Sequence, residues 1–261
     1  MIVMFFVMFY SLVYEYDRQS LDPQSMPVQI QLSVEKEVYY IAEPIHFRIL
    51  LYNNQGNPIK GYFQLSPSLV SYRHKGDPNF SRYMPAWIQI MAKNCVVPTE
   101  LLPNSRWEGH GKLFYDTQFL QPVLANSGEY EIKVEFNDTE NNATIYESNT
   151  ILVKVLRPPE KENSALADLR DQNLAKFLEG DARVNFCKTT DGKDLLIQDN
   201  HFQVGVEKTL AFLERHPQSL YTPIVKKMFV ESISEEYKRS KGKLSAQLQA
   251  IYDYVQSSMR K

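Results

Sequence analysis

The sequence predicts a multidomain β + α chain, an N-terminal antiparallel β-sandwich followed by a C-terminal α-helical bundle. Before the stretch Arg157-Pro158-Pro159-Glu160-Lys161-Glu162-Asn163, apolar residues alternate with polar ones, and after it they recur every three or four residues. Alternation is the period of a half-buried strand, whereas the longer spacing is that of an amphipathic helix. The predicted segments are a leader at 1–26, the sandwich at 27–156, a linker at 157–163 and the helical domain at 164–261.

The strands of the sandwich are predicted from alternating runs separated by turn formers. Val28-Gln29-Ile30-Gln31-Leu32-Ser33-Val34 alternates strictly, and Asn53-Asn54-Gln55-Gly56-Asn57-Pro58 is rich in residues that tolerate positive φ. Further strands are predicted at 45–52, 59–65, 85–91, 106–115, 130–136 and 150–156, with a long polar loop at 66–82. About seven or eight short strands separated by turns are typical of a β-sandwich.

The stretch Asn126-Ser127-Gly128-Glu129-Tyr130-Glu131-Ile132 resembles the tyrosine corner of immunoglobulin-like domains. Tyr39-Tyr40-Ile41-Ala42-Glu43-Pro44-Ile45 also fits immunoglobulin-like and macroglobulin-like sandwiches. The resemblance covers about half of the chain and implies a fold rather than an activity. It implies that Tyr130 is structural, with its hydroxyl bonded to upstream main chain. Ile132 occupies the usual cysteine position, so no inter-sheet disulfide is expected.

The second part of the chain is predicted to be helical. Ser164 is a predicted N-cap and Gly180 a predicted C-terminal stop. The apolar stripe between them is Leu166, Leu169, Leu174, Phe177 and Leu178. Further helices are predicted at 202–215, 222–237 and 244–259, and the segment between Val184 and Ile197 is either a hairpin around Asp191-Gly192 or a loop.

Phe212-Leu213-Glu214-Arg215-His216-Pro217-Gln218-Ser219-Leu220-Tyr221 resembles the helix-to-helix junction of bacterial tetratricopeptide-like repeats. A repeat stack needs a period of about 34 residues, and one junction does not establish a period. A small helical bundle with a Pro-Gln-Ser turn therefore remains the alternative interpretation.

The N-terminal run at 1–14 is unbroken and apolar, too short to span a bilayer and of the length of a signal-peptide core. No Lys or Arg precedes it and no small-x-small cleavage site follows it, so a packed first element is the alternative. We expect a secreted, periplasmic or cell-envelope protein, with a cytoplasmic location as the alternative, and membrane contact at most through this segment. A net charge of −2 argues against nucleic acid as a partner.

Catalytic and metal signatures are not recognisable in the sequence. The five histidines are scattered, no Gly-x-Ser-x-Gly occurs, and Cys187 with His201 is the closest thiol–imidazole pair. Whether Cys95 and Cys187 pair stays open. Three glycosylation sequons begin at Asn79, Asn137 and Asn142, and we interpret them as turn chemistry. No catalytic residue, metal or cofactor is predicted.

Contact chemistry is the remaining signal. The candidate binding residues are Arg73, Arg82, Tyr83, Arg106 and Trp107, in the segments 66–82 and 104–112. Arg, Tyr and Trp dominate many contact surfaces because they bury a large area at low entropic cost. Trp87 is assigned to the core, whereas Trp107 is either core or contact surface.

The function expected from these patterns is an exported binding or scaffolding protein that contacts a protein or glycan partner through sandwich loops, without catalysis of its own. One alternative is an enzyme, or the accessory domain pair of an enzyme, with a site at the domain interface. Another is a carbohydrate-binding module, which requires Trp107 and nearby tyrosines to be exposed and coplanar.

Overall fold

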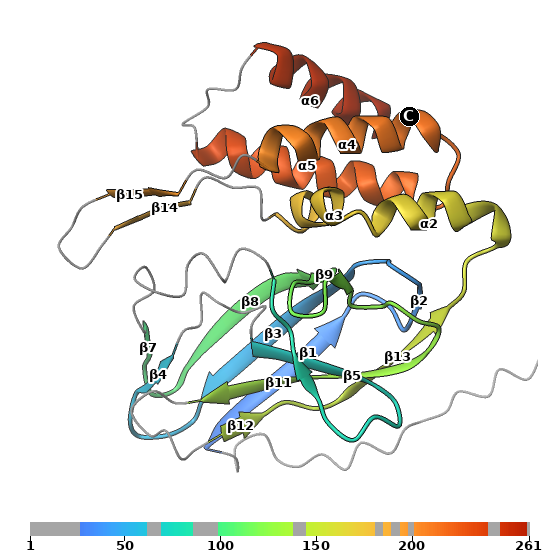
Figure 1. Ribbon diagram of the computed structural model, residues 1–261. Helices are drawn as coiled ribbons and strands as arrows, with labels where there is room; N and C mark the ends of the chain where they lie inside the picture. Colours follow the sequence, from blue (N-terminus) through green and yellow to red (C-terminus); the bar gives the residue numbers. More distant parts are fainter. Residues whose placement is uncertain are drawn as a thin grey trace, which may run out of the picture.

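The computed structural model describes residues 27–61, 69–85, 99–137, 145–180, 185–188, 194–197, 201–239 and 246–259. It is a mixed β and α protein with several antiparallel sheets and, in the described ranges, five α-helices. Apart from β14 and β15, the described strands precede Arg157, and the described helices follow it. The helical half covers one end of the β half (Figure 1).

A three-stranded antiparallel sheet has the order β1-β3-β8. Its strands are β1 (Val28–Val34), β3 (Ile45–Asn53) and β8 (Ser105–Leu113). Pairing runs from Val28 opposite Asn53 to Val34 opposite Phe47, and β8 pairs with the whole of β3. Since side chains alternate across a strand, Phe47, Ile49 and Leu51 share one buried face.

The larger sheet has the order β2-β13-β11-β5-β6, with β12 also on β11. Its strands are β2 (Val38–Tyr40), β5 (Val70–His74), β6 (Ser81–Arg82), β11 (Gly128–Asn137), β12 (Ile145–Glu147) and β13 (Ile151–Leu156). Only the β2–β13 pair among these is parallel. Buried residues of this sheet, such as Ile132 and Val153, join those of the three-stranded sheet in one hydrophobic cluster.

Two short antiparallel pairs complete the described β half. The first joins β4 (Ile59–Gly61) to β7 (Thr99–Leu101), and the second joins β9 (Tyr115–Asp116) to β10 (Gln121–Pro122). In the second pair, the chain reverses over the four residues between the strands. That reversal is tied to β5 by the hydrogen bond from Tyr72 Oη to Asp116.

The long polar loop predicted at 66–82 is wrong, because β5 lies inside it as an interior strand between β11 and β6. Val70, Ser71 and Tyr72 are all buried, so the run lacks the alternation that marks a half-buried strand. The adjacent turn formers, from Gly76 to Pro78, also favoured the prediction of a loop over that of a strand. The contact segment 104–112 likewise falls largely on β8 rather than on a loop.

The helices are α2 (Asn163–Leu169), α3 (Gln172–Glu179), α4 (His201–Arg215), α5 (Thr222–Arg239) and α6 (Ala246–Met259), preceded by the 3₁₀ turn η3 (Glu160–Glu162). The single helix predicted from Ser164 to Gly180 is therefore two helices. Ser164 lies inside α2, whose N-cap is Glu162. Asp171 ends the continuity because its backbone is extended and its carboxylate accepts from Asn173 N and Leu174 N. Gly180, with φ of 99°, ends α3 as predicted.

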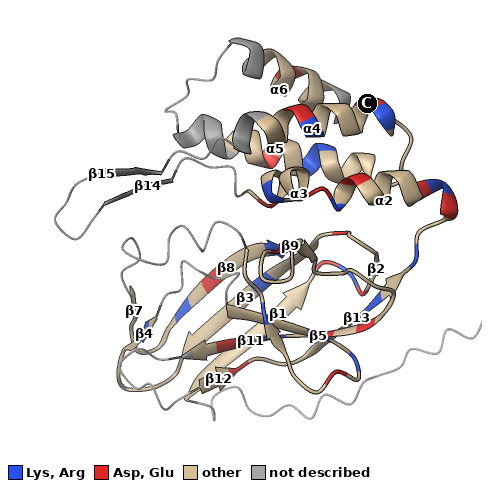
Figure 2. Cartoon of the chain, viewed as in Figure 1, with Lys and Arg blue, Asp and Glu red and all other residues tan. Residues whose placement is uncertain are grey.

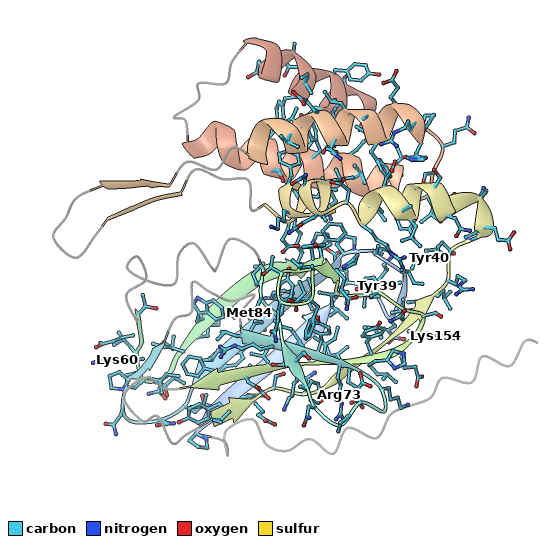
Figure 3. All side chains as sticks on the ribbon, viewed as in Figure 1. Tyr39, Tyr40, Lys60, Arg73, Met84 and Lys154 are labelled. Atoms are coloured by element: carbon cyan, nitrogen blue, oxygen red, sulfur yellow. The ribbon has the colours of Figure 1, made fainter. Side chains whose placement is uncertain are left out.

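The two halves meet at the C-terminal end of α3, in a contact zone that we call the interface. Glu179, the last residue of α3, is 4% exposed and accepts hydrogen bonds from Tyr83 Oη and from Tyr115 N. Lys112 Nζ donates to Leu178 O over 2.6 Å, which satisfies a carbonyl that the helix leaves free. Side chains fill the space between α3 and the sheets (Figure 3).

A second contact of the interface is made by α5. The buried Tyr221, one residue before α5, donates from Oη to Ile41 O over 2.6 Å. Ile41 follows β2, and the next residue, Ala42, has a positive φ of 60° and donates its N–H to Leu124 O. The turn after β2 is thus held by bonds from both halves.

Several sequence predictions fall outside the described residues. These are the apolar leader at 1–26, Trp87, Cys95, the sequon at Asn142 and the turn at Asp191-Gly192. The strands on either side of that turn, β14 (Asn185–Lys188) and β15 (Asp194–Ile197), pair antiparallel, which favours the hairpin over the loop. None of the helices in the described ranges has the length and apolar character needed to span a membrane.

Candidate functional site

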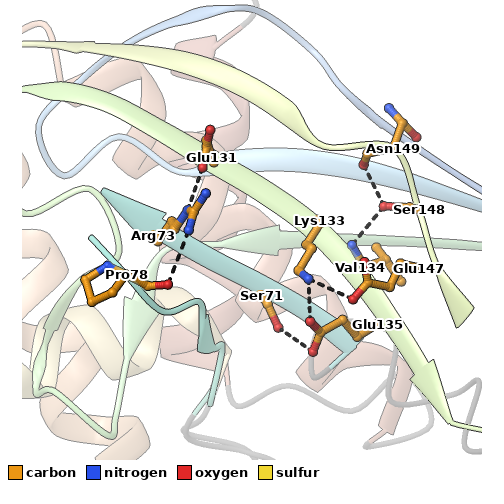
Figure 4. A network of polar contacts seen from close by, with 10 residues as sticks. All are labelled: Ser71, Arg73, Pro78, Glu131, Lys133, Val134, Glu135, Glu147, Ser148 and Asn149. Carbon is orange, nitrogen blue, oxygen red and sulfur yellow. Dashed lines mark hydrogen bonds and ion pairs between the residues drawn. The ribbon is translucent and has the colours of Figure 1, made fainter. Parts of the chain in front are cut away.

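Arg73, the first predicted contact residue, is engaged on β5 by its own surroundings. Its Nε donates to Glu131 Oε2 over 2.5 Å, and its Nη1 donates to the carbonyl oxygens of Asp77 and Pro78. Its guanidinium also lies 4.4 Å from the centre of the Phe80 ring. Arg73 therefore fixes the turn after β5 onto the sheet, on the side shown in Figure 4.

The same sheet face continues as a ladder of ion pairs. Lys133 Nζ lies 2.7 Å from Glu135 Oε1 and 2.9 Å from Glu147 Oε1, and 4.6 Å from the centre of the Phe80 ring. In the view of Figure 2, acidic and basic residues are interspersed over both halves of the chain. Lys133 is largely covered whereas Glu135 and Glu147 are more open to solvent, and surface pairs contribute roughly 0–1 kcal/mol each. The ladder therefore neutralises charge locally, and its groups are engaged with one another.

Tyr83 was predicted to contact a partner, and the structure contradicts this prediction. It is fully buried, donates to Glu179 and accepts from Phe114 N over 3.4 Å. Burial, and then the nearby Glu179 carboxylate, raise the pKa of the Tyr83 phenol well above its usual value. A side chain in this position holds the two halves together and does not reach an external partner. Glu179, its buried acceptor, was missed because a charged residue at a helix end is ordinarily solvated.

The other three predicted contact residues are not brought together. Arg82 is exposed on β6 at the edge of the larger sheet, whereas Arg106 is exposed on β8 in the three-stranded sheet. Trp107 is half-buried against the core, and its ring covers Gly109, where an added Cβ would lie 2.1 Å from the indole. This position favours the interpretation of Trp107 as a core residue. A carbohydrate-binding module requires an exposed Trp107 that is coplanar with nearby tyrosines, so that alternative is not favoured.

A hollow of 250 Å³ does gather several of the residues that the sequence singled out. We call it the edge hollow, because it lies beside β5 and β6 at the edge of the larger sheet. Its lining residues are Tyr72, Arg73, His74, Asp77, Asn79, Ser81, Phe119, Gln121, Val123, Ala125, Asn126 and Tyr130. It therefore joins the turn after β5 to the segment that carries β10.

The floor of the edge hollow is built around Tyr130, which is buried. Its Oη donates to Asn126 O and accepts from Asn126 N, both at 3.2 Å, which is the arrangement that the tyrosine-corner resemblance implies. Burial raises the pKa of the Tyr130 phenol. The His74 ring meets the Tyr130 ring edge-on at 5.0 Å, and its Nε2 lies 3.3 Å from Ser127 O.

Gly128 is required where it stands, next to this floor. Its φ is +142°, and an added Cβ would lie 2.2 Å from His74 Nε2. Both the backbone conformation and the close approach of the imidazole exclude a larger residue without rearrangement. The glycine of the tyrosine-corner stretch thus positions a wall of the hollow as well as a turn.

Two consecutive exposed apolar residues, which we call the rim, follow β9, and the first of them lines the edge hollow. Phe119 is 44% exposed and lines the hollow, and its neighbour Leu120 is 58% exposed. Leu120 has a positive φ of 52°, which is uncommon and costly for a branched side chain. We call residues 117–120 the β9–β10 turn.

The β9–β10 turn is firmly held. Asp116, fully buried, accepts from Tyr72 Oη over 2.9 Å and from Gln118 N over 2.8 Å. Thr117 Oγ1 donates to Met84 O over 2.7 Å. The turn therefore presents its apolar residues from a fixed frame. Sequence reasoning missed it, although an adjacent Phe-Leu pair inside an otherwise polar turn was a visible signal.

Four polar side chains around the edge hollow have no partner within the described ranges. The Asp77 carboxylate and the amides of Asn79, Gln121 and Asn126 form no hydrogen bond or ion pair with another described residue, and all four are exposed. These groups supply one negative charge and several neutral donors and acceptors. The hollow can therefore bind a ligand without first breaking internal bonds at these positions.

A second hollow, of 340 Å³, lies on the three-stranded sheet beside His46, Arg48 and His110. Glu108 accepts from Arg48 Nε and pairs with His110 Nε2, both at 2.8 Å. These two bonds lower the pKa of Glu108 to about 2. Arg48 and His110 of this hollow are thus both engaged with Glu108, whereas Glu35, which also lines it, is exposed. Burial and then the charge of Lys227 lower the pKa of His46.

A third hollow, of 370 Å³, lies in the helical half near the end of α4. His216 Nε2 lies 2.7 Å from Asp168 Oδ2, whereas the Ser219 hydroxyl donates to Glu162. The serine and the histidine are therefore engaged with different carboxylates, which is not the nucleophile–base contact that acyl transfer needs. In the described ranges no three His, Cys, Asp or Glu side chains gather as metal ligands.

Comparisons with known proteins do not assign the chain to a family. No protein-family model matches the sequence, and no curated protein matches it. A CARDB domain from Pyrococcus furiosus is 14% identical, with 49% of this chain and 87% of that one covered and a TM-score of 0.28. The sporulation control protein Spo0M from Bacillus subtilis is 7% identical, with 56% of each chain covered and a TM-score of 0.33.

A β-glucosidase from Erythrobacter marinus is 8% identical, with 49% of this chain and 15% of the enzyme covered and a TM-score of 0.30. The identities and TM-scores of these three neighbours are low. The likenesses therefore carry no argument about function, which has to come from the site itself.

Proposed function

We propose that this chain is a non-catalytic binding protein that contacts a protein partner through the edge hollow and the β9–β10 turn. The observation that carries the proposal is the exposure of two consecutive apolar residues, Phe119, which lines the hollow, and Leu120, which follows it. Neighbouring apolar residues on a firmly bonded turn are unfavourable in water, and they are the kind of anchor that contact surfaces use.

The strained backbone of Leu120 supports the proposal independently. A left-handed conformation costs a non-glycine residue roughly 1–2 kcal/mol. Asn or Gly would occupy this position at lower cost and with better solubility. A leucine held there at positive φ and 58% exposed is consistent with selection for contact rather than for stability.

For the fold, we propose an immunoglobulin-like sandwich followed by a helical bundle. Two sheets that share one hydrophobic cluster, and the Tyr130–Asn126 bonds, support the first part. For the second part, Thr222 Oγ1 donates to His216 O and so closes the turn between α4 and α5. That turn suits a bundle and a tetratricopeptide-like pair equally, and we favour the bundle.

The proposal keeps a scaffolding role for the helical half, which supports the β half at the interface. An enzyme with a site between the halves is less well supported, because the interface carboxylate Glu179 is buried and already accepts two hydrogen bonds. The export expected from the N-terminal segment is part of the proposal, and the partner would then be an envelope or extracellular protein.

Site-specific photocrosslinking tests the proposal. A photoreactive phenylalanine analogue replaces Phe119 in one variant and Tyr254, an exposed aromatic residue of α6, in the matched control. In the native host, we expect a discrete adduct from position 119 and none from position 254. Leu120→Glu in the same chain should abolish the adduct, whereas Leu102→Glu, at a residue of nearly equal exposure, should not.

The proposal fails if position 254 gives the same adducts as position 119, or if Leu120→Glu leaves the adduct unchanged. Melting curves of both glutamate variants control for folding. Since Leu102 and Leu120 are 59% and 58% exposed, neither substitution removes a buried side chain.

A further inference from the structure

We infer that the edge hollow receives a basic side chain, Lys or Arg, of the partner, with Asp77 as its counter-ion and Phe119 as its aromatic wall. This inference rests on the proposed function and names the chemistry of the partner at that same site. Asp77 and Phe119 both line the hollow. A carboxylate beside an aromatic face is a combination suited to a cation, through an ion pair and a cation–π contact.

The charge balance of the lining favours a cation. Arg73 is neutralised by Glu131 at 2.5 Å and bonds to two main-chain carbonyls. His74 is engaged at Nε2 with Ser127 O. Asp77 is therefore the charged side chain of the lining that has no ion-pair partner among the described residues, and its charge is negative.

The neutral groups of the lining suit the same ligand. The amides of Asn79, Gln121 and Asn126 have no partner within the described part of the chain, and their carbonyl oxygens accept from ammonium or guanidinium donors. An arginine side chain, with five N–H donors in a planar fork, matches several acceptors that surround one hollow. Its aliphatic stem would pack against the exposed Phe119, which lines the hollow.

The field of Asp77 reaches the floor of the hollow. The Asp77 carboxylate contributes, after burial, to the raised pKa of the Tyr130 phenol. The carboxylate therefore acts on the interior of the hollow as well as on solvent. A neutral sugar would bind to the amides and to the Phe119 ring but would leave the Asp77 carboxylate without a counter-ion. We therefore favour the basic side chain over a glycan.

The experiment titrates the full chain with N-acetyl-arginine N-methylamide and follows backbone amide signals by NMR. The probe in the comparison arm is the citrulline analogue, which keeps the shape of arginine and removes its charge. A third probe, methyl glucoside, tests the glycan alternative. We expect shifts confined to residues 72–81 and 119–130 with the arginine probe, at a dissociation constant of roughly 10 mM.

Asp77→Asn should weaken arginine binding by about fivefold or more and leave citrulline binding unchanged. The matched control is Asp253→Asn, an exposed aspartate on α6, which should leave the arginine titration unchanged. Phe119→Ala should also weaken arginine binding. Because the Asp77 carboxylate has no partner among the described residues, Asp77→Asn should fold normally, and its melting temperature verifies this.

Equal binding of the arginine and citrulline probes, tighter binding of methyl glucoside at these residues, or the absence of any shift there would each overturn the inference. A Leu120-dependent adduct at position 119 without arginine binding would retain the proposed function and exclude the basic side chain. Arginine binding without such an adduct would show that the hollow binds a basic side chain but would exclude the proposed contact with a protein partner through Phe119 and Leu120.

Discussion

Glu179 at the interface and Asp77 at the edge hollow are both carboxylates that act on a tyrosine, yet their surroundings differ. Glu179 is buried and accepts from Tyr83 Oη and Tyr115 N, so its bonding capacity is used inside the protein. Asp77 is exposed, and its carboxylate has no bond to a described residue. The first arrangement holds the two halves together, and the second leaves bonding capacity for something outside the chain.

The contrast extends to the apolar residues of the two regions. At the interface, Tyr221 and Phe114 are buried, whereas at the edge hollow Phe119 and Leu120 remain exposed. Burial stabilises the fold by roughly 25 cal/mol for each Å² of apolar surface removed from water, and exposed rim residues forgo that gain. Substitutions at the interface should therefore lower stability, and those at the rim should alter contact alone.

The largest expected effect is at the interface. Glu179→Ala should lower the free energy of unfolding by about 3 kcal/mol, because two buried donors lose their acceptor. Glu179→Gln retains an amide oxygen and should lose roughly half as much. Urea unfolding followed by circular dichroism measures both. If neither variant differs from the parent by more than about 0.5 kcal/mol, the Glu179 bonds do not hold the two halves together.

Gly128→Ala should cost about 2 kcal/mol, from backbone strain and from displacement of His74. Gly76→Ala is the matched control, since Gly76 also has a positive φ, of 102°, but open space around its Cα. It should cost about 1 kcal/mol, the strain alone. Equal losses for the two variants in urea would show that the close approach of His74 has no energetic weight.

Tyr130→Phe should cost about 1 kcal/mol, because the hydroxyl makes two bonds to the main chain of Asn126. Tyr254→Phe on the exposed face of α6 should be neutral within about 0.5 kcal/mol. Thermal unfolding of the two variants beside the parent provides the measurement. A neutral Tyr130→Phe would mean that water replaces both bonds and that the corner is not a structural element.

Acidification should lower the stability of the fold through His46, on β3. Its folded-state pKa lies below 6.5, because of burial and then Lys227, with Lys112 acting the same way and Glu35 and Glu231 opposing. The unfolded chain therefore binds the proton more readily, and stability should fall as the pH falls through about 6.5. His46→Gln should flatten this part of the profile. An unchanged slope in the variant would assign the effect to other groups.

The smallest expected effect on stability is at the rim. Leu120→Gly should change the free energy of unfolding by less than about 0.5 kcal/mol, since relief of the positive-φ strain is offset by the larger entropy of glycine in the unfolded chain. Calorimetry on the variant and the parent tests this. A loss above about 2 kcal/mol would show that Leu120 packs as a core residue, and the contrast between the two regions would fail.

Much of the β half was predictable, because its strands obey simple alternation. Val28–Val34 coincides with β1, and the predicted run at 150–156 differs from β13 by one residue. β5 was missed for the opposite reason. It is an interior strand that is buried on both faces over Val70, Ser71 and Tyr72. Apolar and polar residues therefore do not alternate along it as they do along a half-buried strand.

The helical half was predictable as a series of amphipathic helices, but four were predicted where the described ranges hold five. The stripe from Leu166 to Leu178 spans two helices, since both keep their apolar faces on the same core. The break depends on the carboxylate of Asp171, which caps α3 and also binds Lys208 at 2.7 Å. The second partner comes from α4, and a local sequence pattern does not contain it.

The candidate site could be predicted only in part. The bond from Tyr130 to upstream main chain was predicted from a local motif. The internal bonding of Arg73 and the roles of Tyr83 and Phe119 depend on contacts distant in sequence. Tyr83 is buried by Glu179, a residue 96 positions later. Phe119 is exposed on a turn that the buried Tyr72–Asp116 hydrogen bond anchors to the sheet. Side-chain type indicated contact chemistry, and tertiary structure decided which side chains remain available for it.

The bond from Tyr221 to Ile41 joins residues 180 positions apart, which has a consequence for how the chain is made. Because synthesis proceeds from the N-terminus, the turn after β2 exists long before its partner from the start of α5 leaves the ribosome. Closing so long a loop is slow compared with forming local hairpins. The nascent β half should therefore pass through a period with its helix-facing end uncovered, during which a chaperone or a secretion factor can engage it.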